Sequence, residues 1–190
     1  MVYKILAFIG EAGVGKDSIA NAVLAADSSL YKIVSCTTRL PREKEQDGVD
    51  YHFLTGPEFR LGLINKKFAE SAIFNGWYYG TRFEDLSKVQ LNVGVFNPAG
   101  IRNLLKLKDI DLRVIRVQAS EEERKRRYIE RDATADLNEL ERRIKTDTHD
   151  FSLLDFEYVI LKNENKDDFE KAVETVGKWI SAWKATTGQK

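Results

Sequence analysis

The 190-residue chain has little cysteine, little histidine and no net charge, and each shortage excludes a class of function. Its single cysteine, Cys36, cannot form a disulfide within the chain, and nothing in the sequence has paired metal-ligand spacing. Thirty basic residues balance thirty acidic ones, so the broad positive field required for non-specific nucleic-acid binding is missing. We therefore expect a cytoplasmic protein whose partners are small molecules rather than nucleic acids.

Long apolar runs are lacking as well. The apolar stretch at the N-terminus, residues 2–9, is interrupted by Lys4 and is much shorter than the roughly 20 residues that span a bilayer. It leads directly into a glycine-rich turn without a cleavage-like site, so we interpret it as a buried strand and expect no membrane association. With 43% hydrophobic residues the chain can bury one core of good size. A single domain is expected.

Apolar, β-branched runs alternate with stretches of helical period, which predicts an α/β fold with a parallel sheet flanked by helices. The last helix is the clearest, because apolar residues recur at three- and four-residue spacing from Phe169 to Trp183. Between the second and third strands, residues 39–91 carry more glycines and aromatics and predict an inserted subdomain. The predicted strands are residues 2–9, 31–34, 93–96, 112–117 and 158–161.

The segment from Gly10 to Lys16 follows the first predicted strand and precedes a helix-like run, as a Walker A phosphate loop requires. Glycines let backbone N–H groups approach phosphate oxygens, the helix N-terminus adds positive partial charge, and the lysine adds a full charge. We therefore expect ATP as the phosphoryl donor. The predicted ATP-binding residues are Gly10, Ala12, Gly13, Val14, Gly15, Lys16, Asp17 and Ser18.

Asp17 stands where Ser or Thr normally follows the lysine of such a loop. A carboxylate at this position would repel a triphosphate unless a cation lay between them. Our hypothesis is that Asp17 orients a water molecule bound to Mg²⁺, while Ser18 assists at the phosphates. The sequence therefore predicts that the protein uses Mg²⁺ together with ATP.

Four further segments, taken with the phosphate loop, resemble the guanylate kinase family in the correct order. They are Ser35–Arg42, Asp47–Phe53, Phe68–Ala72 and Tyr78–Thr81. The resemblance covers nearly the whole chain and implies an ATP-dependent kinase that converts GMP or dGMP to the diphosphate. It also implies one guanylate-kinase-like domain with three parts: a P-loop core (1–34, 92–120 and 151–190), an NMP-binding insertion (about 35–91) and a lid (about 121–150).

The matching residues suit a purine mononucleotide by their own chemistry. Arg39 and Arg42 can present forked donors to a monophosphate. Glu70 can accept both N–H groups on the Watson–Crick edge of guanine, whereas adenine has an acceptor at the matching ring nitrogen. The resemblance implies that hydroxyls of Ser35 and Thr81 reach the carbonyl edge of the base. The predicted GMP-binding residues are Ser35, Arg39, Arg42, Tyr51, Glu70, Tyr79, Thr81 and Asn97.

By the same resemblance, Arg131 and Arg143 correspond to lid arginines that close on the transferred phosphoryl group. Such a transfer depends on positioning and charge neutralisation. Most of the other charges of residues 119–150 are expected on solvated helices. The oligomeric state is left open between monomer and homodimer. His52 and His149 are expected to be ordinary hydrogen-bonding residues. The predicted catalytic residues are Lys16, Arg39, Arg131 and Arg143.

One segment departs from the family. Guanylate kinases usually carry an Asp-x-Asp-x-x-Gly run, where this chain has Val95 to Gly100 without either acid. The Gly-Lys-Asp loop and the strand ending in Asn97 instead look like ribose 1,5-bisphosphate phosphokinases, and some phage-borne nucleotide kinases show a similar mixture. The alternatives are therefore such a phosphokinase, a deoxynucleoside monophosphate kinase of broader specificity, or a non-catalytic guanylate-kinase-like binding module. Glu70 and the arginine block favour GMP.

Overall fold

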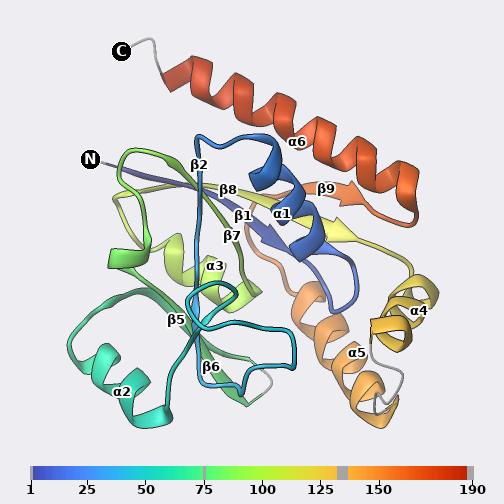
Figure 1. Ribbon diagram of the computed structural model, residues 1–190, viewed down its shortest axis with the longest axis horizontal. Coiled ribbons are helices and arrows are strands. Elements are labelled where there is room, and N and C mark those ends of the chain that lie inside the picture. Colours follow the sequence, from blue (N-terminus) through green and yellow to red (C-terminus); the bar gives the residue numbers. More distant parts are fainter. Residues whose placement is uncertain (1, 75, 132–136, 188–190) are drawn as a thin grey trace.

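Five parallel strands form the central sheet of the computed structural model, which describes residues 2–74, 76–131 and 137–187 (Figure 1). The order across the sheet is β2-β7-β1-β8-β9. The strands are β1 (Tyr3–Ile9), β2 (Leu30–Lys32), β7 (Leu91–Val95), β8 (Ile110–Gln118) and β9 (Val159–Lys162). Each overlaps one of the five strands expected from the sequence, and the predicted parallel α/β sheet is confirmed.

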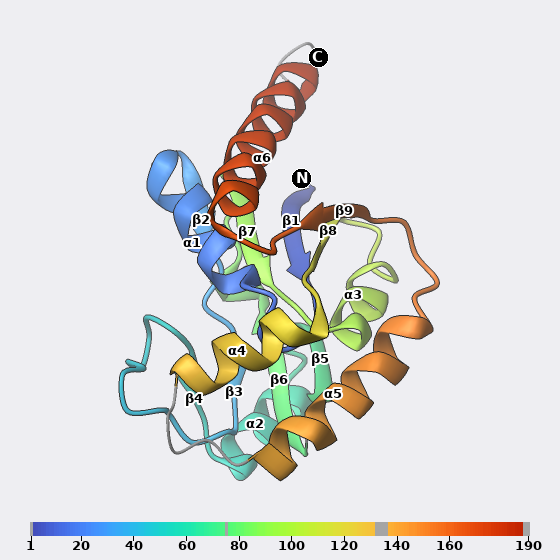
Figure 2. The same cartoon turned by 90° about the vertical axis from the view of Figure 1, so that its right-hand side faces the viewer.

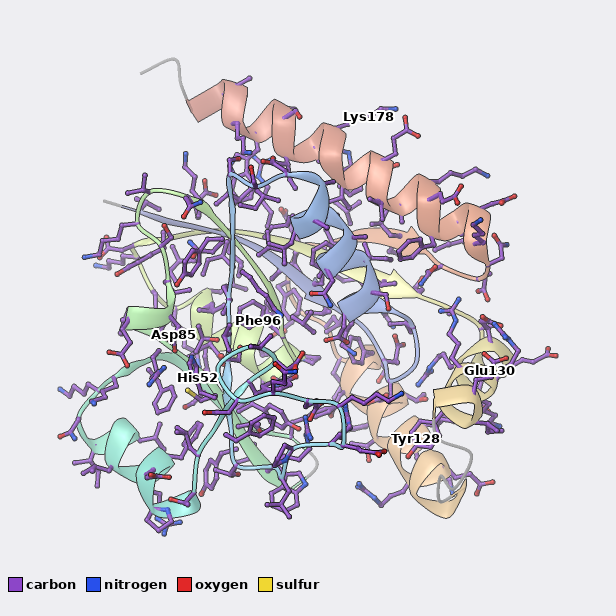
Figure 3. The ribbon with its side chains drawn as sticks, viewed as in Figure 1. His52, Asp85, Phe96, Tyr128, Glu130 and Lys178 are labelled. Carbon is purple, nitrogen blue, oxygen red and sulfur yellow. The ribbon has the colours of Figure 1, made fainter. Side chains whose placement is uncertain are left out.

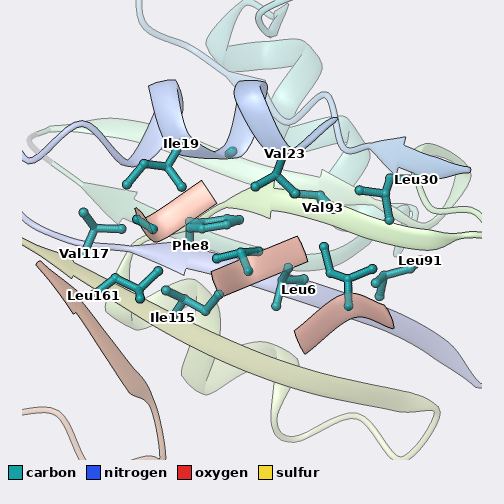
Figure 4. Packing of buried hydrophobic residues seen from close by; sticks show 14 of the residues in the cluster. Leu6, Phe8, Ile19, Val23, Leu30, Leu91, Val93, Ile115, Val117 and Leu161 are labelled. Atoms are coloured by element: carbon teal, nitrogen blue, oxygen red, sulfur yellow. The ribbon is translucent and has the colours of Figure 1, made fainter. Parts of the chain in front are cut away.

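Strand β1 lies at the centre of the sheet, between β7 and β8, and its residues from Ile5 to Ile9 are all buried. A run buried on both faces is typical of a parallel sheet covered by helices on each side. Its side chains alternate between two cores. Leu6 and Phe8 join the cluster beneath α1 (Lys16–Ala26) and α6 (Lys166–Thr187), drawn in Figure 4.

The opposite face of the sheet packs against α3 (Pro98–Leu104) and the end of α5 (Leu137–Ser152). Ile5, Ala7 and Ile9 of β1 form this second cluster with residues of those helices and of the neighbouring segments. The sheet is therefore the middle layer of three. The start of β1 and the end of α6 lie on the same side of the molecule (Figures 1 and 2).

Helix α6 carries the apolar stripe that its sequence spacing predicted. Ala172, Val176, Ile180 and Trp183 are buried, and Phe169, Val173 and Trp179 pack beside them as partly buried side chains. Trp183 also donates from Nε1 to Asp111 Oδ2 at 3.2 Å, and the Arg113 guanidinium lies 4.3 Å from its ring centroid. The stripe is confirmed as a core-packing surface.

A second, four-stranded sheet of order β4-β3-β6-β5 lies beyond the edge of the core (Figure 1). Helix α2 is capped by Thr55, whose side chain and that of Glu58 exchange hydrogen bonds with each other's backbone N–H groups. Asn103 of α3 donates to Ser71 O at 2.8 Å and joins this sheet to the core. Its elements are β3 (Cys36–Thr37), β4 (His52–Phe53), α2 (Gly56–Ile64), β5 (Phe68–Phe74), β6 (Trp77–Arg82) and the 3₁₀ turn η1 (Phe83–Asp85).

Helices α4 (Glu121–Arg131) and α5 lie side by side at the end of the molecule where β8 finishes (Figure 2). Tyr128 of α4 and Ile144 of α5 form a small buried cluster between them. Among the described residues, no helix combines the length and the apolar character that a membrane crossing demands.

We expect Trp183→Ala to lower the free energy of unfolding by about 3–5 kcal/mol, because it removes a large buried ring and leaves a cavity between α6 and the sheet. Urea unfolding followed by circular dichroism measures the change. Trp77→Ala is the matched control: Trp77 is 42% exposed, and a loss of about 1 kcal/mol or less is expected there. Equal losses in the two variants would contradict the proposed packing of α6.

Candidate active site

The turn between β1 and α1 has a backbone shape that depends on glycine. Gly10 and Gly15 have φ angles of +155° and +84°, and Gly15 is the N-cap of α1. A Cβ atom on Gly10 would lie 2.5 Å from Val117 O, and one on Gly15 would lie 2.5 Å from Asn163 Nδ2. Both positions therefore need glycine for conformational and steric reasons. The turn has the geometry of a phosphate loop, with the open N–H groups of a helix start behind it.

Lys16, Asp17 and Ser18 form the first turn of α1. The Lys16 side chain is 20% exposed and its Nζ lies 3.8 Å from Asp17 Oδ2, while the Asp17 side chain is 65% exposed. No group of three His, Cys, Asp or Glu side chains within the described ranges is arranged to hold a metal ion. Mg²⁺ in nucleotide kinases commonly takes one or two carboxylates together with water and substrate phosphates, so one exposed carboxylate beside Lys16 fits the water-mediated role hypothesised for Asp17.

The loop is also held from outside by residues that the sequence did not single out. Arg127 of α4 donates to Val14 O at 3.1 Å and to Asn163 O at 2.8 Å. Asn163, which directly follows β9 and is 3% exposed, donates from Nδ2 to Val14 O at 2.8 Å. These hydrogen bonds keep the carbonyl of Val14 turned away from the side of the loop on which backbone N–H groups would face a bound anion. No local sequence pattern reveals such contacts, because they join segments 36 to 149 residues apart.

Arg39 and Arg42, the predicted phosphate-binding arginines, converge on one point. That point is the carboxylate of Glu45, which accepts from both terminal nitrogens of Arg39 at 2.8 and 2.9 Å and from Arg42 NH1 at 3.1 Å. Burial opposes its ionisation, but hydrogen bonds from the two arginines outweigh burial and lower the pKa of Glu45. Glu45 was missed in the sequence because it looks like one charge among many in a polar loop.

Tyr51 and Tyr79 lie beside this cluster. Their ring centroids are 6.1 Å apart, and the Arg39 guanidinium lies 5.4 Å from the Tyr51 ring. Burial, and next the negative charge of Asp17, raise the pKa of Tyr51. The phenol is therefore a neutral hydrogen-bond donor, and the influence of Asp17 means that the phosphate loop and the arginine cluster are within electrostatic reach of each other.

Glu70 occupies a separate, deeply buried position on β5. It is 6% exposed and pairs across the sheet with Thr81, whose Oγ1 lies 3.2 Å from Ser35 Oγ. Burial raises the pKa of Glu70 to about 7, although hydrogen bonds from Thr81 act in the opposite direction. The carboxylate faces the start of α3, since a Cβ on Gly100 would lie 2.8 Å from Glu70 Oε2.

Asn97 has a structural task at this place. Its Oδ1 accepts from Gly100 N at 2.8 Å and caps the first turn of α3. The sequence predicted that Asn97 contacts a base, and that role stays a prediction; its NH₂ group lies outside the cap and is available as a donor. Ser35, Glu70, Thr81 and Asn97 are thus brought to one place from four separate segments.

His52 lies away from both clusters. Its Nε2 is 3.4 Å from Asp85 Oδ1, and Asp85 also accepts from Arg82 Nε at 2.7 Å (Figure 3). These contacts fit the ordinary structural role expected of His52. Arg131 and Arg143 belong to α4 and α5, but their side chains lie outside the described part of the structure, so their role as lid arginines stays a prediction.

The central strand of the parallel sheet leads through a glycine loop into a helix that begins with lysine. This arrangement defines a P-loop nucleotide-binding protein, here with a second cationic cluster opposite the loop. Comparison with known proteins narrows this class. The family model for guanylate kinase matches residues 3–183, and the chain belongs to the guanylate kinase family. The family predicted from the sequence is confirmed, and with it the enzyme class, nucleoside monophosphate kinase.

Individual relatives agree with this assignment. The guanylate kinase of Malacoplasma penetrans is 33% identical over 176 residues, which cover 88% of this chain and 89% of the relative. That of Chlorobaculum tepidum is 30% identical over 184 residues, covering 94% and 92%. The crystal structure of guanylate kinase from Anaplasma phagocytophilum has a TM-score of 0.71 at 22% identity and covers 95% of this chain and 86% of that one. The last likeness supports the fold.

The raised pKa of Glu70 makes stability depend on pH. Between pH 4.5 and about 7 the folded protein holds this proton and the unfolded chain does not, so stability falls as pH rises through that window. We expect Glu70→Gln to abolish this contribution, which amounts to up to about 3 kcal/mol.

Urea unfolding at about pH 5 and pH 8 measures most of this contribution, since the two values span most of the window. Glu84→Gln is the control, because Glu84 is 62% exposed and the variant should retain the wild-type slope. An unchanged slope in Glu70→Gln would show that the Glu70 carboxyl titrates normally.

Proposed function

We propose that the protein transfers the γ-phosphoryl group of ATP to GMP or dGMP in the presence of Mg²⁺. The observation that carries this proposal is the placement of Glu70: a buried carboxylate, flanked by two hydroxyls, on the same small sheet that carries the arginine cluster. Guanine offers two adjacent N–H donors to such a group, and a monophosphate offers oxygens to the arginines. The names of the relatives support the same acceptor.

The acceptor phosphate is proposed to bind Arg39 and Arg42, with Tyr51 and Tyr79 as uncharged donors. Glu45 pairs with both guanidinium groups and offsets one of their two positive charges. An incoming phosphate therefore shares or replaces an existing carboxylate contact, and the arginines are already oriented when it arrives. This arrangement lowers the entropy lost by two long side chains on binding.

The donor phosphates are proposed to bind the loop N–H groups and Lys16. Mg²⁺, oriented through water by Asp17, would neutralise charge on the donor's phosphate oxygens. Arg131 and Arg143, carried by α4 and α5, are proposed to close over the transferred group and to exclude water. We further propose that this enzyme acts in the cytoplasm as a monomer or homodimer.

A broader acceptor range is the second candidate, and the segment from Val95 to Gly100 favours it. This segment carries no carboxylate, and the side-chain oxygen of Asn97 accepts the hydrogen bond that caps α3. Recognition of the base would then rest on Glu70 with the hydroxyls of Ser35 and Thr81. Ribose 1,5-bisphosphate, which has no base, would leave Glu70 without its proposed partner.

An acceptor panel tests the proposal. In a coupled assay with ATP and Mg²⁺, we expect GMP and dGMP to give the highest kcat/KM among GMP, dGMP, AMP, CMP, UMP, dTMP and ribose 1,5-bisphosphate. Glu70→Ala should lower kcat/KM for GMP by about 100-fold or more and flatten the preference for GMP over AMP. Glu84→Ala, a change of the same type at an exposed site, should leave both unchanged. An unaltered preference in Glu70→Ala would remove Glu70 as the base reader.

Lys16→Ala should reduce turnover by about 100-fold or more, because the full positive charge at the donor phosphates is lost. Single-turnover rates with saturating ATP and GMP measure this loss apart from binding. Lys178→Ala, on the exposed face of α6 (Figure 3), is the control and should match the wild type. Retained turnover in the Lys16 variant would contradict the proposed donor site.

A further inference from the structure

A buried ion pair joins the two helices of the predicted lid directly to the phosphate loop. Arg124 of α4 and Asp147 of α5 lie 3.3 Å apart (NH2 to Oδ2), and their side chains are 7% and 2% exposed. Most charges of the stretch 119–150 were expected on solvated helices. Arg124 and Asp147 are exceptions, because both turn inward against the loop.

The Arg124–Asp147 pair hydrogen-bonds to both peptide groups that flank Ala12. Ala12 N donates to Asp147 Oδ2 at 2.6 Å, and Ala12 O accepts from Arg124 Nε at 2.8 Å. The two peptide planes on either side of the Ala12 Cα are therefore fixed, and with them its φ and ψ angles. These two contacts span 135 and 112 residues of sequence, so the middle of the loop is shaped by distant helices.

Helix α4 packs tightly against the phosphate loop. A Cβ on Gly13 would lie 2.8 Å from Arg124 O and 3.1 Å from Arg124 Cα. A movement of α4 would therefore displace the loop at Ala12 and Gly13. Asp147 also reaches the donor site electrostatically: burial raises its pKa, while the Ala12 N–H and then the positive charge of Lys16 favour its ionised form.

A buried ion pair is costly unless its hydrogen bonds are complete, and a pair whose partners also bind backbone groups meets that condition. Its hydrogen bonds to the backbone on both sides of Ala12 point to a task beyond packing. We propose that Arg124 and Asp147 are positioning residues of the donor site, which set the shape of the phosphate loop and link it to the lid helices. This inference rests on the proposed use of ATP as the donor, and it is independent of which acceptor is phosphorylated.

The test compares Asp147→Asn, Arg124→Met and the double variant. Each should weaken ATP binding by about tenfold, measured by isothermal titration calorimetry in the absence of acceptor and well below the melting temperature of each variant. The affinity for GMP alone should stay within about twofold of the wild type. The double variant should bind ATP no worse than Arg124→Met, because it does not leave the Asp147 charge buried without a partner.

Two further variants separate positioning from plain stability. Arg126→Met makes the same change on the exposed face of α4, where Arg126 pairs with Glu123 and Glu130, and should leave the affinity for ATP unchanged. Arg124→Lys keeps the charge but not the forked geometry. It should retain part of the affinity for ATP that Arg124→Met loses. If Arg124→Met does not fold, Asp147→Asn and the double variant decide the matter.

Variants that melt earlier but bind ATP with wild-type affinity would overturn the inference, since the pair would then serve stability alone. Equal weakening of ATP and GMP would overturn it as well, because the effect would not belong to the donor site. A wild-type protein that binds ATP but phosphorylates an acceptor other than GMP would contradict the proposed function and leave this inference standing.

Discussion

The structure depends on one geometric constraint: five parallel strands deliver the segments that follow them to the same edge of the sheet. Lys16 and α1 follow β1, Ser35 follows β2, Asn97 follows β7, α4 follows β8 and Asn163 follows β9. β1 lies at the centre, so its glycine loop has neighbours on both sides. Ligands of open α/β sheets bind outside the carboxyl ends of the strands, and here each of the five segments contributes to that edge.

Charge at this edge is partly balanced within the protein itself. Glu45 offsets one of the two positive charges of Arg39 and Arg42, and Asp147 neutralises Arg124 beside the loop. Without these carboxylates, clustered guanidinium groups would repel one another and spread apart. The two acids nevertheless differ in how ligand binding would affect them. Glu45 stands where the acceptor phosphate is proposed to bind and must share its arginines, whereas Asp147 binds a loop N–H and can keep its place when the donor binds.

The sequence predicted those features that local spacing determines. Alternating runs gave the five strands, three- and four-residue spacing gave the buried stripe of α6, and glycines beside Lys16 gave the loop. It could not predict contacts that arise only when distant segments meet, as with Asp147 and Ala12, which are 135 residues apart. Asn97 illustrates a further limit, because an asparagine before Pro98 can cap a helix or read a base, and only the hydrogen bond to Gly100 shows that it caps.

The proposed recognition of the base then depends mainly on one carboxyl group, that of Glu70. Burial raises the pKa of Glu70 to about 7, so its charged form, which is the form that accepts two N–H groups, is not strongly favoured near neutral pH. Guanine supplies the two donors that stabilise the charge, and adenine or a bare sugar phosphate supplies no such pair. A ligand without these donors would meet a Glu70 that is about half protonated near neutral pH, and would gain little from it. In the proposed acceptor site, the desolvation of Glu70 would therefore allow a single carboxylate to discriminate between acceptors, even though the segment from Val95 to Gly100 carries no acid to assist it.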